Sequence, residues 1–156
     1  MQDAIRFYAT TGPWGCFSNF SPHEFCIAGA RYKTVEHYFQ AAKFVDTDDR
    51  WPISILKAKT PKLAAEMGRS REHRIAPAWD SQKNDVMYRA LIAKFSQNRD
   101  CLVTLLSTGT ATIIESSQKD YYWGEGGDGS GKNMLGKLLM KLRAEMIDEL
   151  MKVYDY

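Results

Sequence analysis

The sequence lacks several features that mark particular classes of protein. It contains no apolar run of about 18 residues, so we expect no membrane-spanning helix. Residues 1–6 show no basic segment followed by an apolar stretch, so we expect no signal peptide. The three cysteines are odd in number, widely spaced and without a Cys-x-x-Cys pair. That usage predicts reduced thiols in a cytoplasmic protein.

The net charge is also small, and histidines are few. The formal net charge is only +2, whereas dedicated nucleic-acid-binding proteins usually carry a clear basic excess. The three histidines, His23, His37 and His73, are scattered without the spacing of metal ligands. We therefore expect neither a metal nor another cofactor.

The chain nevertheless has what one folded domain needs. Its 156 residues suit a single domain over 1–156, and 44% of them are hydrophobic, enough to fill a core without disulfides. The charged fraction of 26% is ordinary for a globular protein, which excludes whole-chain disorder.

Local patterns predict more helix than strand. We expect strands at 5–8 and 112–115, a hairpin over 25–32, and helices at 34–44, 61–67, 81–95, 99–106 and 133–153. Thr34 and Thr60 are predicted N-caps, as is Asp80 or Ser81, while Gly68 is predicted to follow its helix as a C′ residue. Short, scattered strands favour an irregular, mostly α-helical α+β fold over a doubly wound sheet.

Five of the eleven glycines fall within residues 124–131. Residues 126–132 fit the phosphate-loop pattern G-x-x-x-x-G-K, but Asn133 stands where Ser or Thr should hold magnesium, and no buried strand precedes the loop. We reject that interpretation. Two remain: a flexible surface loop, or a loop at a helix N-terminus that binds a phosphate or sugar oxygen with Trp123 and Asn133 beside it.

The helix predicted from Thr34 is apolar or aromatic except for one polar stripe. Glu36, Gln40 and Lys43 are spaced to share one face. The stripe either lines a cavity or faces solvent. In a cavity, burial would raise the pKa of the glutamate and lower that of the lysine, which suits acid–base or Schiff-base chemistry.

Two carboxylates flank the turn that leads into the glycine loop. Glu115 ends a predicted strand and Asp120 precedes a run of aromatic residues, so both are candidate site residues, whereas Gln118 and Lys119 suit a solvated turn. Most aromatic residues outside the helices are expected to fill the core, and one or two to stack on a base.

Several ordered motifs resemble those of the NADAR (YbiA-like) family, from about Phe7 to Arg143. They are residues 17–20 and 34–44, then Met67-Gly68-Arg69, Trp79 and 87–95, and finally 105–109, Glu115, 120–124 and 131–140.

This resemblance implies an N-glycosidase with a compact, mostly α-helical fold and no metal. Family members are linked to phosphoribosyl-aminopyrimidine intermediates of riboflavin synthesis and to ADP-ribose on guanine, including guanine in DNA. The implied partners are thus a small ribosyl or ADP-ribosyl substrate and ADP-ribosylated DNA, with no membrane.

The resemblance also implies site residues. Glu36 would be the carboxylate that stabilises the developing cation or activates water, and Lys43 either its partner or a Schiff-base nucleophile. Asp120 would bind ribose hydroxyls or act as the second acid. The expected substrate-binding residues are Asn19, Phe20, Trp79, Glu115, Trp123, Gly124 and Asn133. Trp123 would stack on the base, and Asn133 with the glycine loop would hold the phosphate.

Two other classes compete with the enzyme. A non-catalytic module that binds ADP-ribose or a related nucleotide would use the same loop and aromatics, but its carboxylates would be dispensable and no free base would appear. A nucleic-acid-binding domain would show a steep salt dependence, and the small net charge disfavours it.

Overall fold

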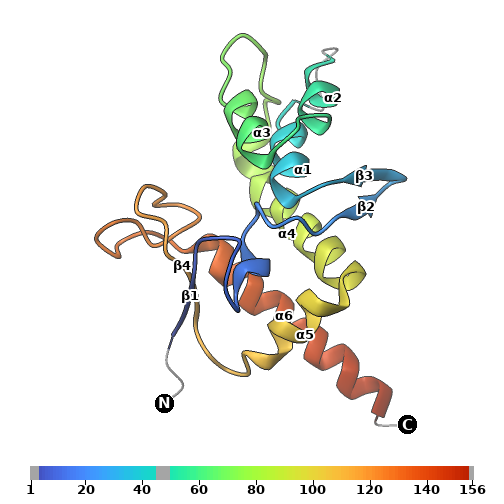
Figure 1. Ribbon diagram of the computed structural model, residues 1–156, viewed down its shortest axis with the longest axis vertical. Helices are drawn as coiled ribbons and strands as arrows, with labels where there is room; N and C mark the ends of the chain where they lie inside the picture. The colour runs from blue at the N-terminus through green and yellow to red at the C-terminus, as the bar shows by residue number, and fades with distance from the viewer. Residues whose placement is uncertain (1–3, 45–49, 155–156) are drawn as a thin grey trace. The chain divides into compact units, whose positions relative to one another are not determined.

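The computed structural model describes residues 4–44 and 50–154, which contain six α-helices and a few short strands (Figure 1). The mostly helical α+β class is thereby confirmed. Residues 1–3, on which the expectation of no signal peptide partly rests, lie outside the described residues. The chain divides into two compact units, one of residues up to Ser18 together with those from Arg99 on, the other Asn19–Asn98. One domain over 1–156 stays a prediction.

The unit of residues 19–98 begins with the predicted hairpin. Strand β2 (Phe25–Ile27) pairs antiparallel with β3 (Ala30–Tyr32), and Phe25 lies opposite Tyr32. The two turn residues, Ala28 and Gly29, both have positive φ, at 50° and 80°. That geometry matches the twist of a two-residue hairpin loop.

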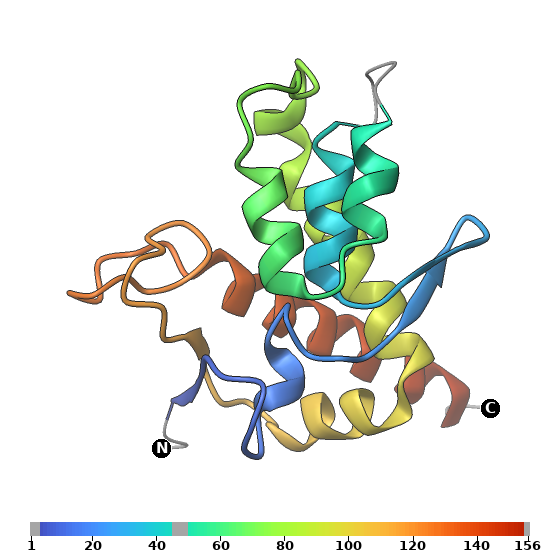
Figure 2. The same cartoon turned by 45° about the horizontal axis from the view of Figure 1, so that its top comes forward.

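Three helices of this unit pack side by side, as Figures 1 and 2 both show. They are α1 (Val35–Ala42), α2 (Trp51–Leu56) and α3 (Pro61–Gly68). Their shared core consists of Ala41, Phe44, Ile55, Ala58 and Ala64, with Trp51 and Met67 packed against it. The sequence analysis missed α2, which is short and has no side-chain N-cap.

The helix ends were predicted with mixed success. Thr34 and Thr60 cap α1 and α3 as expected, each accepting a backbone N–H three residues on. Gly68 is not the C′ residue that was predicted: it is the last helical residue, followed by right-handed Arg69. A Cβ at Gly68 would overlap the side chain of Gln40, so close helix packing explains this glycine.

Helix α4 (Trp79–Gln97) starts before the caps predicted for it. Ala78 is the N-cap and contributes no side-chain bond, while the Ser81 hydroxyl donates to the Ala78 carbonyl instead. The helical spacing of its apolar residues predicts a core stripe, and the stripe is confirmed, because Val86, Met87, Ala90, Leu91 and Phe95 are all buried. Lys94 is buried beside them and donates to Ser21 Oγ at 2.7 Å.

The other unit is built on a parallel strand pair and two helices. Strand β1 (Ile5–Phe7) pairs with β4 (Ile113–Glu115) in the register Ile5 to Ile113. A short 3₁₀ helix, η1 (Gly15–Phe17), buries Phe17 edge-on against Phe7, with ring centroids 5.7 Å apart. Helix α5 (Arg99–Ser107) follows the predicted bounds closely.

Helix α6 (Met134–Tyr154) is buried only along its first half. The helical spacing of its leucines predicts one buried face, and Leu135, Leu139 and Leu142 are buried. The prediction is wrong at the far end of the helix, where Leu150 is 44% exposed. Arg143 ends the buried part by donating to Thr108 Oγ1 and to the Ala111 carbonyl, both at 2.8 Å. Within the described residues, no helix has the length and apolar character that crossing a membrane requires.

Candidate active site

The ten site residues predicted from the sequence divide evenly between the two units. Unit 19–98 holds five of them: Asn19, Phe20, Glu36, Lys43 and Trp79. The other unit holds Glu115, Asp120, Trp123, Gly124 and Asn133.

The polar face of α1 is buried at Glu36 and Gln40, which excludes the solvent-facing interpretation for these two residues; that they line a cavity stays a prediction. Glu36 is 9% exposed and Gln40 8%, although both side chains are polar. Gln40 Nε2 donates to Glu36 Oε1 at 2.6 Å, so the carboxylate is held in place from the next turn of its own helix. A buried carboxylate fixed by a donor is the arrangement that acid–base or electrostatic catalysis needs.

Lys43 follows on the same face at the end of α1 and is half-buried. Its Nζ lies 3.4 Å from the Gly68 carbonyl of α3, to which it donates. Burial lowers the pKa of the Lys43 ammonium; the Glu36 carboxylate opposes this shift, and the cations Arg69 and Lys83 add to it. A lysine whose pKa is lowered is easier to deprotonate, which both acid–base and Schiff-base roles require.

A cleft opens beside Lys43. It has a volume of about 720 Å³ and is lined by Lys43, Gly68, Arg69, Ser70, Arg71, His73 and Ile75. Its wall from 68 to 76 is anchored to α1, because the Ala76 N–H donates to the Lys43 carbonyl at 2.7 Å. The size falls in the range typical of small-molecule sites.

Asn19 lies at the start of α1, close to the backbone of Glu36. Its carbonyl accepts the Glu36 N–H at 3.1 Å, and its Nδ2 lies 3.6 Å from Met87 Sδ. Its side-chain oxygen Oδ1 is buried, and within the described chain it has no hydrogen-bond partner. A buried acceptor without a partner is uncommon in folded proteins and is suited to bind a donor of a ligand. Phe20 beside it is 37% exposed.

Trp79 is buried against α1 and does not present its ring on the surface for stacking. It is 8% exposed and packs against Phe39 of α1, with ring centroids 4.9 Å apart and planes tilted by 58°. Its side chain therefore supports the helix that carries Glu36. Contact between Trp79 and a substrate stays a prediction.

In the other unit, Asn133 ties the start of α6 to β4. Its Nδ2 donates to the Ile113 carbonyl at 2.9 Å, and its Oδ1 accepts the Glu115 N–H at 3.0 Å. Its backbone is left-handed, with φ of 48°. The amide of Asn133 thus has a structural task, and the phosphate-binding role inferred for it stays a prediction.

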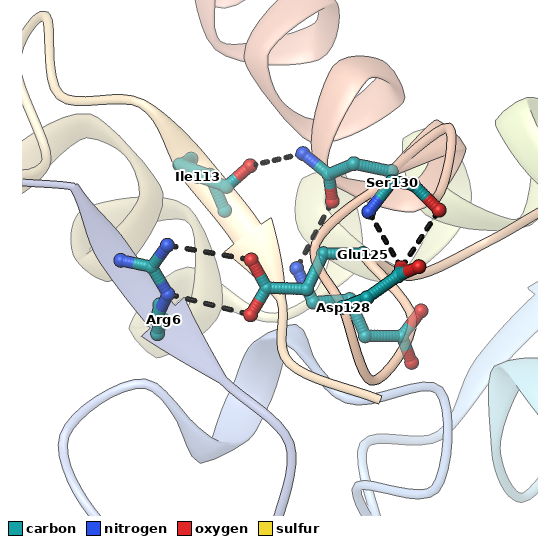
Figure 3. A network of polar contacts seen from close by, with 7 residues as sticks. Arg6, Ile113, Glu125, Asp128 and Ser130 are labelled. Atoms are coloured by element: carbon teal, nitrogen blue, oxygen red, sulfur yellow. Dashed lines mark hydrogen bonds and ion pairs between the residues drawn. The ribbon is translucent and has the colours of Figure 1, made fainter. Parts of the chain in front are cut away.

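The glycine loop between β4 and α6, orange in Figure 1, folds on itself. A phosphate bound at the start of α6 would need the backbone N–H groups of residues 131–135, but all five donate to backbone carbonyls of residues 121–125. An ion pair of 3.3 Å joins Arg6 of β1 to Glu125, and Asp128 accepts two bonds from Ser130 (Figure 3). These contacts hold the loop in one conformation, which argues against the flexible surface loop considered from the sequence.

Asp120 shapes the turn that presents Trp123. Its Oδ1 accepts the N–H groups of Tyr122 and Trp123 at 2.9 and 2.7 Å, and neither amide engages Oδ2. The Trp123 ring is half-buried and meets Tyr122 edge-on. Gly124 next to it is buried where a Cβ would crowd Ser117 and the Glu115 carbonyl, so packing requires this glycine.

Sequence reasoning missed three residues of the cleft: Arg69, Arg71 and His73. Arg69 stands in the Met67-Gly68-Arg69 motif that carries the family resemblance, and a basic run follows Gly68, but an exposed charge run is usually just a solvated surface. Buried Lys94 was also missed, because the helical pattern gave no reason to place a cation in the core.

Comparison with known sequences decides the family. A family model described as the NADAR domain matches residues 6–147, nearly the whole chain and parts of both units. The chain belongs to the NADAR family. The resemblance drawn from the sequence motifs is thus confirmed.

Two relatives named N-glycosidases match along nearly their full length. The chain is 43% identical to N-glycosidase YbiA of Escherichia coli over 150 residues, 96% of this chain and 92% of the relative. It is 42% identical to an N-glycosidase of Nostoc punctiforme, with 91% and 92% covered. A riboflavin biosynthesis protein of Zea mays, PYRR, is 42% identical, but this chain spans only 25% of it.

The fold agrees with a solved NADAR structure. The NMR structure of E. coli YbiA superposes with a TM-score of 0.88 at 43% sequence identity, covering 97% of this chain and 89% of that one.

Proposed function

We propose that this chain is an N-glycosidase that hydrolyses the bond between ribose C1 and the nitrogen of a base. Its family and the names of its relatives support this reaction. The single observation that carries the proposal is the buried Glu36 carboxylate, held by Gln40 at 2.6 Å and followed on the same face by Lys43.

The chemistry follows from the bond that breaks. As the C1–N bond lengthens, positive charge develops on the ribose ring and negative charge on the leaving nitrogen. Glu36 stabilises the first charge or removes a proton from the attacking water, which adds to C1. A proton then reaches the departing nitrogen, so that free base and free ribosyl product result.

Lys43 has two roles compatible with its position. As an ammonium it favours the ionised form of Glu36. As an amine it adds to C1 of the ring-opened sugar, the bond from C1 to the base breaks, and the base leaves with a proton from the amine; water then hydrolyses the resulting Schiff base to free sugar and free Lys43. Trapping with borohydride separates them, because only the Schiff base is reduced to a stable adduct. We propose that Asp120 binds ribose hydroxyls through Oδ2 or acts as the second acid.

We propose phosphoribosyl-aminopyrimidine intermediates of riboflavin synthesis as the first substrate class. The support is that one relative is named a riboflavin biosynthesis protein. ADP-ribose on guanine, free or in DNA, is the second class, since it presents the same ribose C1–N bond. We also propose a cytoplasmic location, consistent with three cysteines that are thiols.

The experiment incubates the protein with both substrate classes and follows released base, ribose 5-phosphate and ADP-ribose by mass spectrometry. Glu36→Gln is expected to slow release by about a hundredfold or more, the usual contribution of an acid–base group. Glu66→Gln, an exposed glutamate of α3, is the matched control. Nucleotide binding without any release by the wild type would show a binding module and refute the enzyme.

A further inference from the structure

The cleft beside Lys43 is strongly cationic. Three of its lining residues are basic, Lys43, Arg69 and Arg71, and none of the described residues that line it is a carboxylate. Lys43 and Arg69 line the same cleft, so the ammonium and the guanidinium are like charges on one surface. Like charges on one surface repel one another, and an anionic ligand that binds between them relieves this repulsion.

The wall that carries the two arginines is braced from several sides. It begins at Gly68, whose carbonyl accepts from Lys43, and it returns to α1 through the Ala76 N–H bond. His73 stacks on Trp51 of α2, with ring centroids 4.1 Å apart and planes inclined by 12°. A braced wall loses little conformational entropy when it binds a ligand.

Between the arginines, Ser70 supplies a neutral donor. Its Oγ accepts the Glu72 N–H at 3.3 Å, which leaves the hydroxyl hydrogen able to point at a ligand. Guanidinium groups match the oxygens of phosphate through paired N–H bonds. A serine hydroxyl adds a donor that an anion can accept.

We propose that this cleft binds the phosphate ester on the 5′ oxygen of the substrate's ribose, with Arg69 and Arg71 as ligands and Ser70 as an additional donor. The proposal rests on the N-glycosidase function above and deepens it. The phosphate site is thereby assigned to the wall next to Lys43 and not to the glycine loop, because the amides of that loop donate within the loop. A monoester and a diphosphate share this chemistry.

The test measures binding to the full chain by calorimetry, with ribose 5-phosphate, ADP-ribose and ribose as probes. Arg69→Gln and Arg71→Gln are each expected to weaken binding of a phosphorylated probe by about tenfold or more, the usual effect of losing a charge-assisted bond. Arg89→Gln removes the same charge from an exposed position of α4 outside the cleft and serves as the control. Thermal unfolding checks that each variant is folded.

The two probes identify the source of the phosphate. A loss for ribose 5-phosphate supports a monoester site, and a loss confined to ADP-ribose supports a diphosphate site. Binding of both probes at wild-type strength by the double variant would overturn the proposal, as would equal losses in Arg89→Gln.

This test is separable from that of the proposed function, because it needs no turnover. Arginine-dependent binding without base release would support the phosphate-binding role of the cleft and refute the N-glycosidase activity. If the enzyme is active, the ratio of kcat/KM for phosphorylated over unphosphorylated substrate should fall toward one in the double variant. An unchanged ratio would refute the phosphate-binding role of the cleft without affecting the proposed N-glycosidase activity.

Discussion

Gln40 holds Glu36 from one helical turn away, with Nε2 2.6 Å from Oε1. Both side chains are buried, and Gln40 in turn sits against Gly68 of α3, where a Cβ would collide with it. The position of the carboxylate is therefore set by α1 and by the closeness of α3. Gln40 is a positioning residue for Glu36.

Gln40→Leu should lower kcat by about tenfold, since a hydrogen bond to a charged group contributes about 1.5–3 kcal/mol. KM should change little. Because the lost donor stabilised the carboxylate, the acidic limb of the pH–rate profile should move to higher pH. Gln82→Leu, at an exposed position of α4, is the control. A lower kcat with an unmoved acidic limb would indicate only a packing defect.

The pKa of Lys43 should depend on its neighbours in opposite directions. Burial lowers it below the ordinary value of 10.5, with Glu36 opposing the shift and Arg69 adding to it. Removing the cation in Arg69→Gln should raise this pKa, and removing the anion in Glu36→Gln should lower it further. The pH dependence of acetylation at Lys43, followed by mass spectrometry, measures both. Shifts of the same sign in the two variants would contradict this electrostatic account.

His37 should make stability depend on pH. It is fully buried; its Nε2 lies 3.1 Å from the Ala58 carbonyl and its Nδ1 2.8 Å from Thr34 Oγ1, which suits a neutral ring that donates through Nε2. Burial lowers its pKa from the ordinary 6.5, although the Ala58 bond opposes the shift.

The unfolded chain therefore takes up the proton first as pH falls. The contribution of His37 is fully present above about pH 7 and is lost as pH falls from there toward the lowered pKa. Urea unfolding between pH 7.5 and pH 5.5, buffer values chosen to span about one pH unit either side of the ordinary pKa, measures the slope. His37→Gln should flatten it; an equal slope in the variant would assign the effect to other groups.

Asn133 should matter more for stability than for binding. Asn133→Gly keeps the left-handed backbone but loses both amide bonds, and should reduce the free energy of unfolding by about 2 kcal/mol at about 1 kcal/mol per bond. Asn133→Ala should cost about 1 kcal/mol more, because alanine disfavours that backbone region. Urea unfolding measures both. A raised KM at unchanged stability would instead support the predicted phosphate contact.

Local patterns were enough for most elements of the fold. Thr34 and Thr60 mark helix starts because their hydroxyls can satisfy amides only a few residues away, and the 25–32 hairpin follows from its turn. Such local patterns could not predict helix α2 or the packing role of Gly68. The first is held by packing against α1 and α3, and the second reflects the approach of Gln40 from another helix.

The sequence by itself determined the family, through motifs in order, and the helix face that carries Glu36, Gln40 and Lys43, because helical spacing is a local property. Only the tertiary structure decided that this face is buried, that the basic run after Gly68 forms a cleft beside Lys43, and that the Asn133 amide holds β4. Burial, clefts and long-range hydrogen bonds join residues far apart in the chain, and no local pattern encodes which distant group will fill the space.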